Sequence, residues 1–205
     1  MVLSLSNFLV MGLMFFMMGD SAMASSDEFY QVTKTFKDIE IRSYPKLLVA
    51  ETAISSTQNE DSSAGFPILA GYIFGKNKGR PAGAQMTASV PAQKIAMTAP
   101  VSVEKGAAGP VLQFFMPSGM NESNAPEPND PRVKLRTLPE RTLAVLRYSG
   151  TWSEERFKKH ADLLKDAIKR EGYEAKSEPI LARYNAPWTP WFLRRNEVWI
   201  EISHK

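Results

Sequence analysis

A short pattern occurs twice in the 205-residue chain, and this repeat restricts the folds open to it. Ile39-x-Ile41-Arg42-x-x-Pro45-x4-Ala50 matches Val133-x-Leu135-Arg136-x-x-Pro139-x4-Ala144, with an offset of 94 residues at every matched position. A segment with apolar residues at helical spacing follows each copy. An Ala-Pro pair (Ala99-Pro100 and Ala186-Pro187) then precedes another strand-like segment. The repeat therefore predicts two β-β-α-β-β halves.

One such half leaves a sheet face and an edge uncovered, whereas two halves related by a pseudo-two-fold axis bury both. We therefore predict a single α+β domain over residues 25–205, with a curved or barrel-like antiparallel sheet and two helices packed on it. The halves are expected at about residues 29–120 and 131–203. The polar, proline-punctuated stretch of residues 117–131 is interpreted as the link between them.

The clearest local predictions concern the strands at the start of the domain and the two helices. Residues 29–54 are predicted to form two strands interrupted by Pro45, followed by a polar loop over residues 55–65. The first helix is predicted to carry Pro67 in its first turn and to end at Gly75. The second is predicted over residues 151–172, with Thr151 and Glu154 as a capping box.

The N-terminal segment is predicted to be a signal peptide over residues 1–24. Residues 8–18 form an uncharged apolar run that is too short for a bilayer span of roughly 20 residues. Ala22-Met23-Ala24 gives an A-x-A cleavage pattern after it. The alternative is an uncleaved apolar tail. We expect export to the periplasm or the extracellular space, with no stable membrane anchor after cleavage.

Composition excludes several classes of function. The chain has no cysteine, so it forms no disulfide, thiolate haem or cysteine-ligated cluster, and it has only two histidines. Its formal net charge of +3 is mild, and no basic run is interleaved with aromatic residues, so no nucleic-acid partner is predicted. No G-x-S-x-G, H-E-x-x-H or P-loop motif is present, so we do not predict an enzyme.

Several short motifs resemble the SOUL haem-binding family and occur in that family's order. They are Ala70-Gly71-Tyr72-Ile73-Phe74-Gly75, Lys94-Ile95-Ala96-Met97-Thr98-Ala99-Pro100-Val101, Phe115-Met116-Pro117-Ser118, Arg147-Tyr148-Ser149-Gly150 and Tyr184-Asn185-x-Pro187-Trp188-Thr189-Pro190. Together with Pro126-x-Pro128-x-Asp130-x-Arg132-Val133 and Arg194-Arg195-Asn196-Glu197-Val198-Trp199, they cover nearly all of residues 29–203. The resemblance implies a distorted eight-stranded antiparallel sheet or barrel flanked by two long helices.

The resemblance also implies reversible binding of haem or another tetrapyrrole in an apolar cleft, as a carrier or buffer. By position in the family, the first helix would supply one wall through Phe66, Ala70, Ile73 and Phe74. The opposite wall would come from the loop that carries Pro187, Trp188 and Trp191. Propionate contacts would fall to Lys76, Lys78 or Arg80, or to Arg194 and Arg195. The family's basic residues on the helix have no counterpart here, since Ser63 and Gly71 stand at the aligned positions.

No axial iron ligand is predicted, and each candidate has a structural alternative. His160 is interpreted as a half-buried or solvated helix residue, Met97 as core, and Tyr72 and Tyr184 as packing residues that could also ligate ferric iron. Trp188 and Trp191 could plug the barrel end instead of stacking on a ligand. Arg194 and Arg195 could bind carbonyls or Glu197 within a turn. Other apolar small-molecule ligands, a tetrapyrrole-modifying enzyme and a protein-interaction role for the Trp-rich loop remain open.

Overall fold

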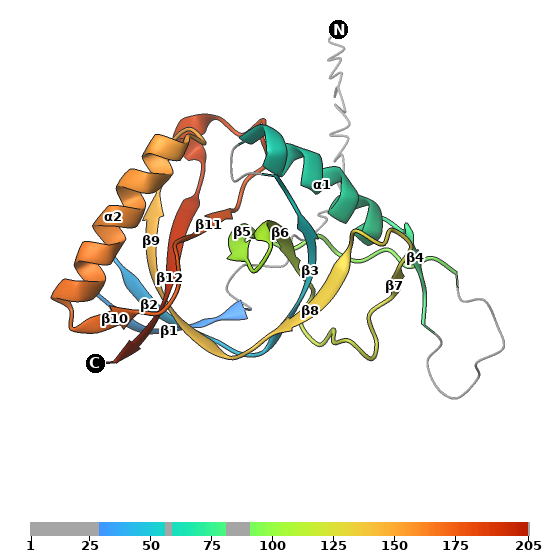
Figure 1. The fold of residues 1–205 in the computed structure, drawn as a ribbon, viewed down its shortest axis with the longest axis horizontal. Coiled ribbons are helices and arrows are strands. Elements are labelled where there is room, and N and C mark those ends of the chain that lie inside the picture. The colour runs from blue at the N-terminus through green and yellow to red at the C-terminus, as the bar shows by residue number, and fades with distance from the viewer. Residues whose placement is uncertain (1–28, 56–58, 81–90, 205) are drawn as a thin grey trace, which may run out of the picture.

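The computed structural model describes residues 29–55, 59–80 and 91–204, and is drawn in Figure 1. The predicted signal segment, residues 1–24, lies outside the described residues. Within these ranges an antiparallel sheet curls into a half-barrel with two helices against it, so the predicted α+β class is confirmed. Its main path runs β1-β2-β9-β12-β11-β5-β6-β3-β8, and β10 pairs with β12 beside that path.

The strands of the sheet come from both halves of the chain. In sequence order they are β1 Gln31–Thr35, β2 Glu40–Tyr44, β3 Leu47–Ala53, β5 Val101–Gly106, β6 Gly109–Phe115, β8 Lys134–Leu138, β9 Arg141–Tyr148, β10 Tyr173–Ala175, β11 Ile180–Arg183 and β12 Asn196–His204. The short strands β4 Asn77–Lys78 and β7 Glu127–Pro128 pair separately. The predicted pair of strands over residues 29–54 is thus three, because the chain turns between Phe36 and Ile39.

The strand order reflects the sequence repeat. Without β1 the path is β2-β9-β12-β11 followed by β5-β6-β3-β8, so each strand of one half has a counterpart at the mirrored position. The register matches as well. Ala144 of β9 pairs with Ile41 and Ile200, and its repeat equivalent Ala50 of β3 pairs with Leu135 and Phe114. The two halves therefore exchange their first strands, which places β2 beside β9 and β8 beside β3.

Helix α1 spans Asn59–Ile73 and is longer than predicted. The prediction that Pro67 lies in its first turn, and that residues 55–65 form a loop, is wrong: Pro67 lies inside the helix. The predicted stop is correct. Gly75 has a φ of 111°, a conformation that favours glycine, and Lys76 N donates to the Gly71 carbonyl at 2.8 Å.

Helix α2 spans Glu154–Arg170, with Ala161, Leu164 and Ile168 buried on one face as predicted. Its N-cap is Ser153, whose side chain accepts a hydrogen bond from the backbone N–H of Arg156. The predicted cap at Thr151 is therefore wrong by two residues. Ser153 occupies the extended backbone conformation that a cap requires, and its oxygen reaches an otherwise unpaired donor of the first turn.

The core divides into three clusters of buried side chains. One lies under α2 and includes Ile41, Leu164 and Ile200; another lies under α1 and includes Leu69, Tyr72 and Phe114. The third includes Tyr44, Phe115 and Trp199. Phe157, in the first turn of α2, packs against both helix clusters, so that turn lies beside the core beneath α1. No helix in the described part of the chain is long and apolar enough to cross a bilayer.

Candidate functional site

The predicted wall on α1 is a stripe at the edge of the helix's buried face. Phe66 and Ala70 are four residues apart and share one side of α1, and Phe74 follows at the same interval just beyond the helix, where its N–H donates to the Ala70 carbonyl at 2.9 Å. The Phe66 ring packs edge-on against Phe114 with centroids 5.2 Å apart, and Phe74 is 61% exposed. Ile73 is buried in the core below, so it supports the stripe from beneath. The small Ala70 side chain between two rings leaves a low, apolar surface.

The second predicted wall is the segment of residues 187–193 between β11 and β12, here called the tryptophan loop. Trp188 is 85% exposed, and the 3-10 turn η2, Trp191–Leu193, presents Trp191 edge-on to Phe192 at 5.5 Å. The interpretation of Trp188 and Trp191 as plugs for the barrel end is not supported by this exposure. Both indole rings are instead accessible to a ligand or a surface.

Arg194 holds the tryptophan loop in shape. Its Nε donates to the Thr189 carbonyl at 2.7 Å and its Nη2 donates to the Pro187 carbonyl at 2.6 Å. Gly150 N donates to the Trp191 carbonyl at 3.1 Å, which ties the loop to the segment before α2. This matches the alternative in which Arg194 binds carbonyls. A propionate contact from Arg194 would have to add to these bonds.

Figure 1 shows the tryptophan loop, in red between β11 and β12, at the end of the molecule where α1 and α2 begin. The packing of Phe157 against the core beneath both helices agrees with this arrangement. The N-terminal half of the α1 stripe and the loop thus belong to one end of the half-barrel. Phe74 and the residues after it lie toward the other end of α1.

The predicted cations beyond α1 are exposed. The aliphatic chain of Lys76 covers Gly71, where an added Cβ would meet the Lys76 Cδ at 3.1 Å. Arg80 Nη1 donates to the Ser123 carbonyl at 3.4 Å. Both side chains are exposed, and both residues follow the C-terminal end of α1 in the chain.

The candidate iron ligands are engaged elsewhere. His160 Nδ1 lies 2.7 Å from the Arg156 carbonyl, and its ring stacks on Tyr148 at 4.0 Å. The Tyr72 hydroxyl donates to the Pro126 carbonyl at 2.8 Å, and burial raises its pKa to about 12. Tyr184 donates to Glu197. Among the described residues no three histidine or carboxylate side chains cluster as metal ligands. His160, Tyr72 and Tyr184 are thus each hydrogen-bonded within the protein.

A buried charge cluster fastens the half-barrel, and the sequence interpretation anticipated only its contact between Arg195 and Glu197, as one alternative within a turn. Glu197 is fully buried and accepts hydrogen bonds from Arg42, Arg195, Tyr184 and the Trp199 indole. Burial raises the pKa of the Glu197 carboxyl. The hydrogen bonds from Arg42 and the charges of Arg42 and Arg195 outweigh burial, so its pKa lies below its usual value. Charged residues in an apolar strand pattern were the available signal.

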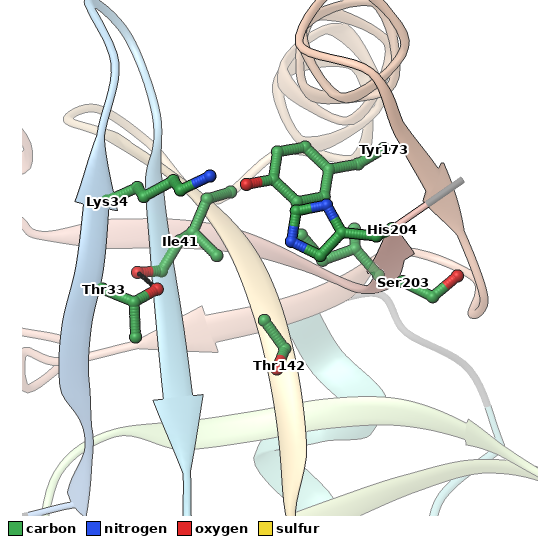
Figure 2. Close-up of a pocket in the computed structure, with 8 residues that line it drawn as sticks. Thr33, Lys34, Ile41, Thr142, Tyr173, Ser203 and His204 are labelled. Atoms are coloured by element: carbon green, nitrogen blue, oxygen red, sulfur yellow. Dashed lines mark hydrogen bonds between the residues drawn. The ribbon is translucent and has the colours of Figure 1, made fainter.

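A hollow of about 260 Å³ lies away from the predicted walls, between β1 and β2 on one side and β10 and β12 on the other. Figure 2 shows Lys34, Tyr173 and His204 around its mouth. The Lys34 Nζ is 5.8 Å from the Tyr173 ring centroid, and the His204 ring packs on Tyr173 at 4.7 Å. None of the predicted site residues lines it.

The curled sheet with two helices defines an α+β, barrel-like class of domain that also occurs in other solved structures. The C-terminal domain of EcmrR aligns with a TM-score of 0.55 at 13% identity, over 86% of this chain and 99% of that one. A hydrolase from Listeria innocua aligns with a TM-score of 0.52 at 10% identity, over 83% and 94%. At these identities the likeness concerns the fold alone.

The family model of the SOUL heme-binding protein matches residues 27–201. The chain therefore belongs to the SOUL heme-binding protein family, as the motifs predicted. A comparison with curated proteins found no match.

Proposed function

We propose that this chain binds haem or another tetrapyrrole reversibly, as a carrier or buffer, and that it is exported. Membership of the SOUL family supports a tetrapyrrole ligand. The observation that carries the placement is the set of exposed aromatic side chains at one end of the half-barrel, with Phe66 on α1 and Trp188 and Trp191 on the tryptophan loop. Apolar side chains left in water gain free energy when a flat apolar ligand covers them.

The energetics suit reversible binding. Covering several hundred Å² of porphyrin face contributes on the order of 5–10 kcal/mol at roughly 25 cal/mol/Å², before the costs of ordering are subtracted. Lys76 and Arg80 would bind the propionates at the outer end of the α1 stripe. In this proposal the protein contacts the faces and the propionates of the porphyrin, and no side chain of the protein reacts with it.

A haemin titration of residues 25–205, followed by the Soret band, tests the proposal. A saturable change at one haem per chain is the expected result. Progressive conversion of the bound spectrum would indicate a tetrapyrrole-modifying enzyme and would contradict the carrier role. Absence of a Soret change, with binding of uncharged hydrophobic dyes, would contradict tetrapyrrole binding and indicate a general apolar pocket.

A further inference from the structure

The tryptophan loop exposes four large apolar side chains, of which only Trp188 and Trp191 belong to the predicted ligand wall. Trp188, Trp191, Phe192 and Leu193 are between 57% and 85% exposed, although they fall within six residues. Single exposed apolar side chains are normal on a folded protein, but a contiguous group of large ones marks an interaction surface. Two of the four, Phe192 and Leu193, were not predicted as site residues.

The loop keeps this exposed shape through polar bonds at its base. Arg194 holds the Pro187 and Thr189 carbonyls, and Gly150 holds the Trp191 carbonyl. These hydrogen bonds fix the backbone of the loop, while its apolar side chains stay exposed to solvent. They can be covered by a partner with little further ordering of the backbone.

The base of the loop is cationic. The guanidinium carbons of Arg183 and Arg194 lie 4.6 Å and 4.4 Å from the centroid of the Trp152 ring. Burial and the neighbouring charge of Arg194 lower the pKa of Arg183 to about 10, with Tyr148 acting in the opposite direction. Within the described ranges no carboxylate forms a salt bridge with Arg194, whose guanidinium contacts the Thr189 and Pro187 carbonyls and the Trp152 ring.

The adjoining first turns of α2 add both signs of charge. Glu154 and Glu155 begin the helix, and Arg156, Lys158 and Lys159 follow them. The Arg156 guanidinium lies against Gly150, 3.0 Å from where a Cβ would stand. Together with the two arginines at Trp152, the cations of the loop base and of the first turns of α2 outnumber Glu154 and Glu155, while Glu60 and Asp61 at the start of α1 reduce the excess at this end of the molecule.

We propose that the tryptophan loop docks reversibly on an anionic lipid surface, with Trp188, Trp191, Phe192 and Leu193 entering the interface. Indole rings favour the headgroup level, where one edge is apolar and the other wet, and phenylalanine and leucine favour the acyl boundary. The exposed cations in the first turns of α2, Arg156, Lys158 and Lys159, would attract lipid phosphates, and an electrically neutral vesicle surface would not offer that attraction. The proposal concerns attachment to one leaflet and does not depend on tetrapyrrole binding.

Sedimentation with vesicles, in the absence of haem, tests it. Vesicles of phosphatidylcholine with one fifth phosphatidylglycerol should bind residues 25–205, and phosphatidylcholine alone should bind them at least about fivefold more weakly. Trp188→Ala and Phe192→Ser should each reduce partitioning about tenfold, since each removes a large apolar side chain from the interface. Leu163→Ala is the matched control, because Leu163 is an exposed apolar residue on α2 away from the loop.

Three results would overturn the proposal: no binding to either vesicle, equal binding to both, or equal losses for Leu163→Ala and the loop variants. Concentration-dependent self-association through the loop without vesicle binding would also overturn it and would indicate a second copy as the partner. Unfolding midpoints in urea for both loop variants identify a variant that has failed to fold. Because the haemin titration contains no lipid, either proposal can fail while the other stands.

Discussion

Arg42 and Glu197 are 155 residues apart in sequence and form a two-pronged ion pair in the core. Arg42 Nη1 donates to Glu197 Oε2 at 2.9 Å, and Nη2 donates to Oε1 at 3.2 Å. They join β2 to β12, which flank β9. The pair thus fastens a strand of the first half to the last strand of the second.

Glu197→Gln should lower the free energy of unfolding by about 3 kcal/mol or more, because it leaves two guanidinium groups without their buried carboxylate. Glutamine has nearly the same shape as glutamate, so the substitution creates no cavity and the change in stability reports the lost charge. Urea unfolding followed by circular dichroism measures the change. Asp130→Asn, which breaks the exposed 2.6 Å pair with Arg132, is the control and should leave the midpoint unchanged. Equal effects of the two substitutions would contradict the special role of the buried pair.

Acid should destabilise the protein partly through Glu197. Its pKa is depressed in the folded state, so its contribution is present above the ordinary glutamate pKa and is lost as pH falls through the folded value. The urea midpoint should therefore decline below about pH 4.3. The Glu197→Gln variant should decline less steeply over the same range. Parallel pH profiles for the two proteins would contradict this assignment.

Ser153→Ala should destabilise the fold by about 1 kcal/mol, since the Ser153 side chain accepts from Arg156 N at the start of α2. Thr151→Ala should leave stability nearly unchanged, although the sequence spacing favoured Thr151 as the cap. Thermal unfolding of both variants compares them directly. A larger loss for Thr151→Ala would restore the capping box.

The repeat predicted the fold because residues at equivalent positions of the two sequence copies occupy equivalent positions in the sheet. Ala50 and Ala144 occupy equivalent sheet positions, and Pro45 and Pro139 lie between consecutive strands in each half. The start of α1 escaped prediction because residues 59–65 are polar and Pro67 is a poor helix-interior residue, so local propensity argued against the helix. Packing of Leu69, Tyr72 and Ile73 on the sheet overrides that propensity.

The site was predictable only in part for a similar physical reason. Family position names Phe66, Trp188 and Trp191 as candidates, but only the structure shows that their rings are exposed. The direction of an arginine side chain, toward solvent or toward its own loop, depends on the backbone conformation of the loop, which the sequence does not give. Arg194 is committed to two carbonyls. The charge of Glu197 within an apolar strand pattern is visible in the sequence. Its partners come from β2, from β12 and from the residues beside β11 and β12, so no local pattern identifies them.

His160→Ala should leave the spectrum of bound haem unchanged. The His160 ring stacks on Tyr148 and its Nδ1 contacts the Arg156 carbonyl, so both contacts already engage it within the protein. Absorption spectra of the haem complex of both proteins provide the measurement. A displaced Soret maximum in the variant would assign His160 as the iron ligand.

The haemin affinities of Phe66→Ala, Trp191→Ala and Leu163→Ala, compared with that of the unsubstituted protein by Soret titration, test the proposed site most directly. The first two remove exposed rings from α1 and the tryptophan loop, and each should weaken binding about tenfold. Leu163→Ala changes an exposed apolar residue elsewhere on the molecule and should leave affinity unchanged. Saturable binding with the same affinity in all four proteins would contradict a tetrapyrrole site between these walls.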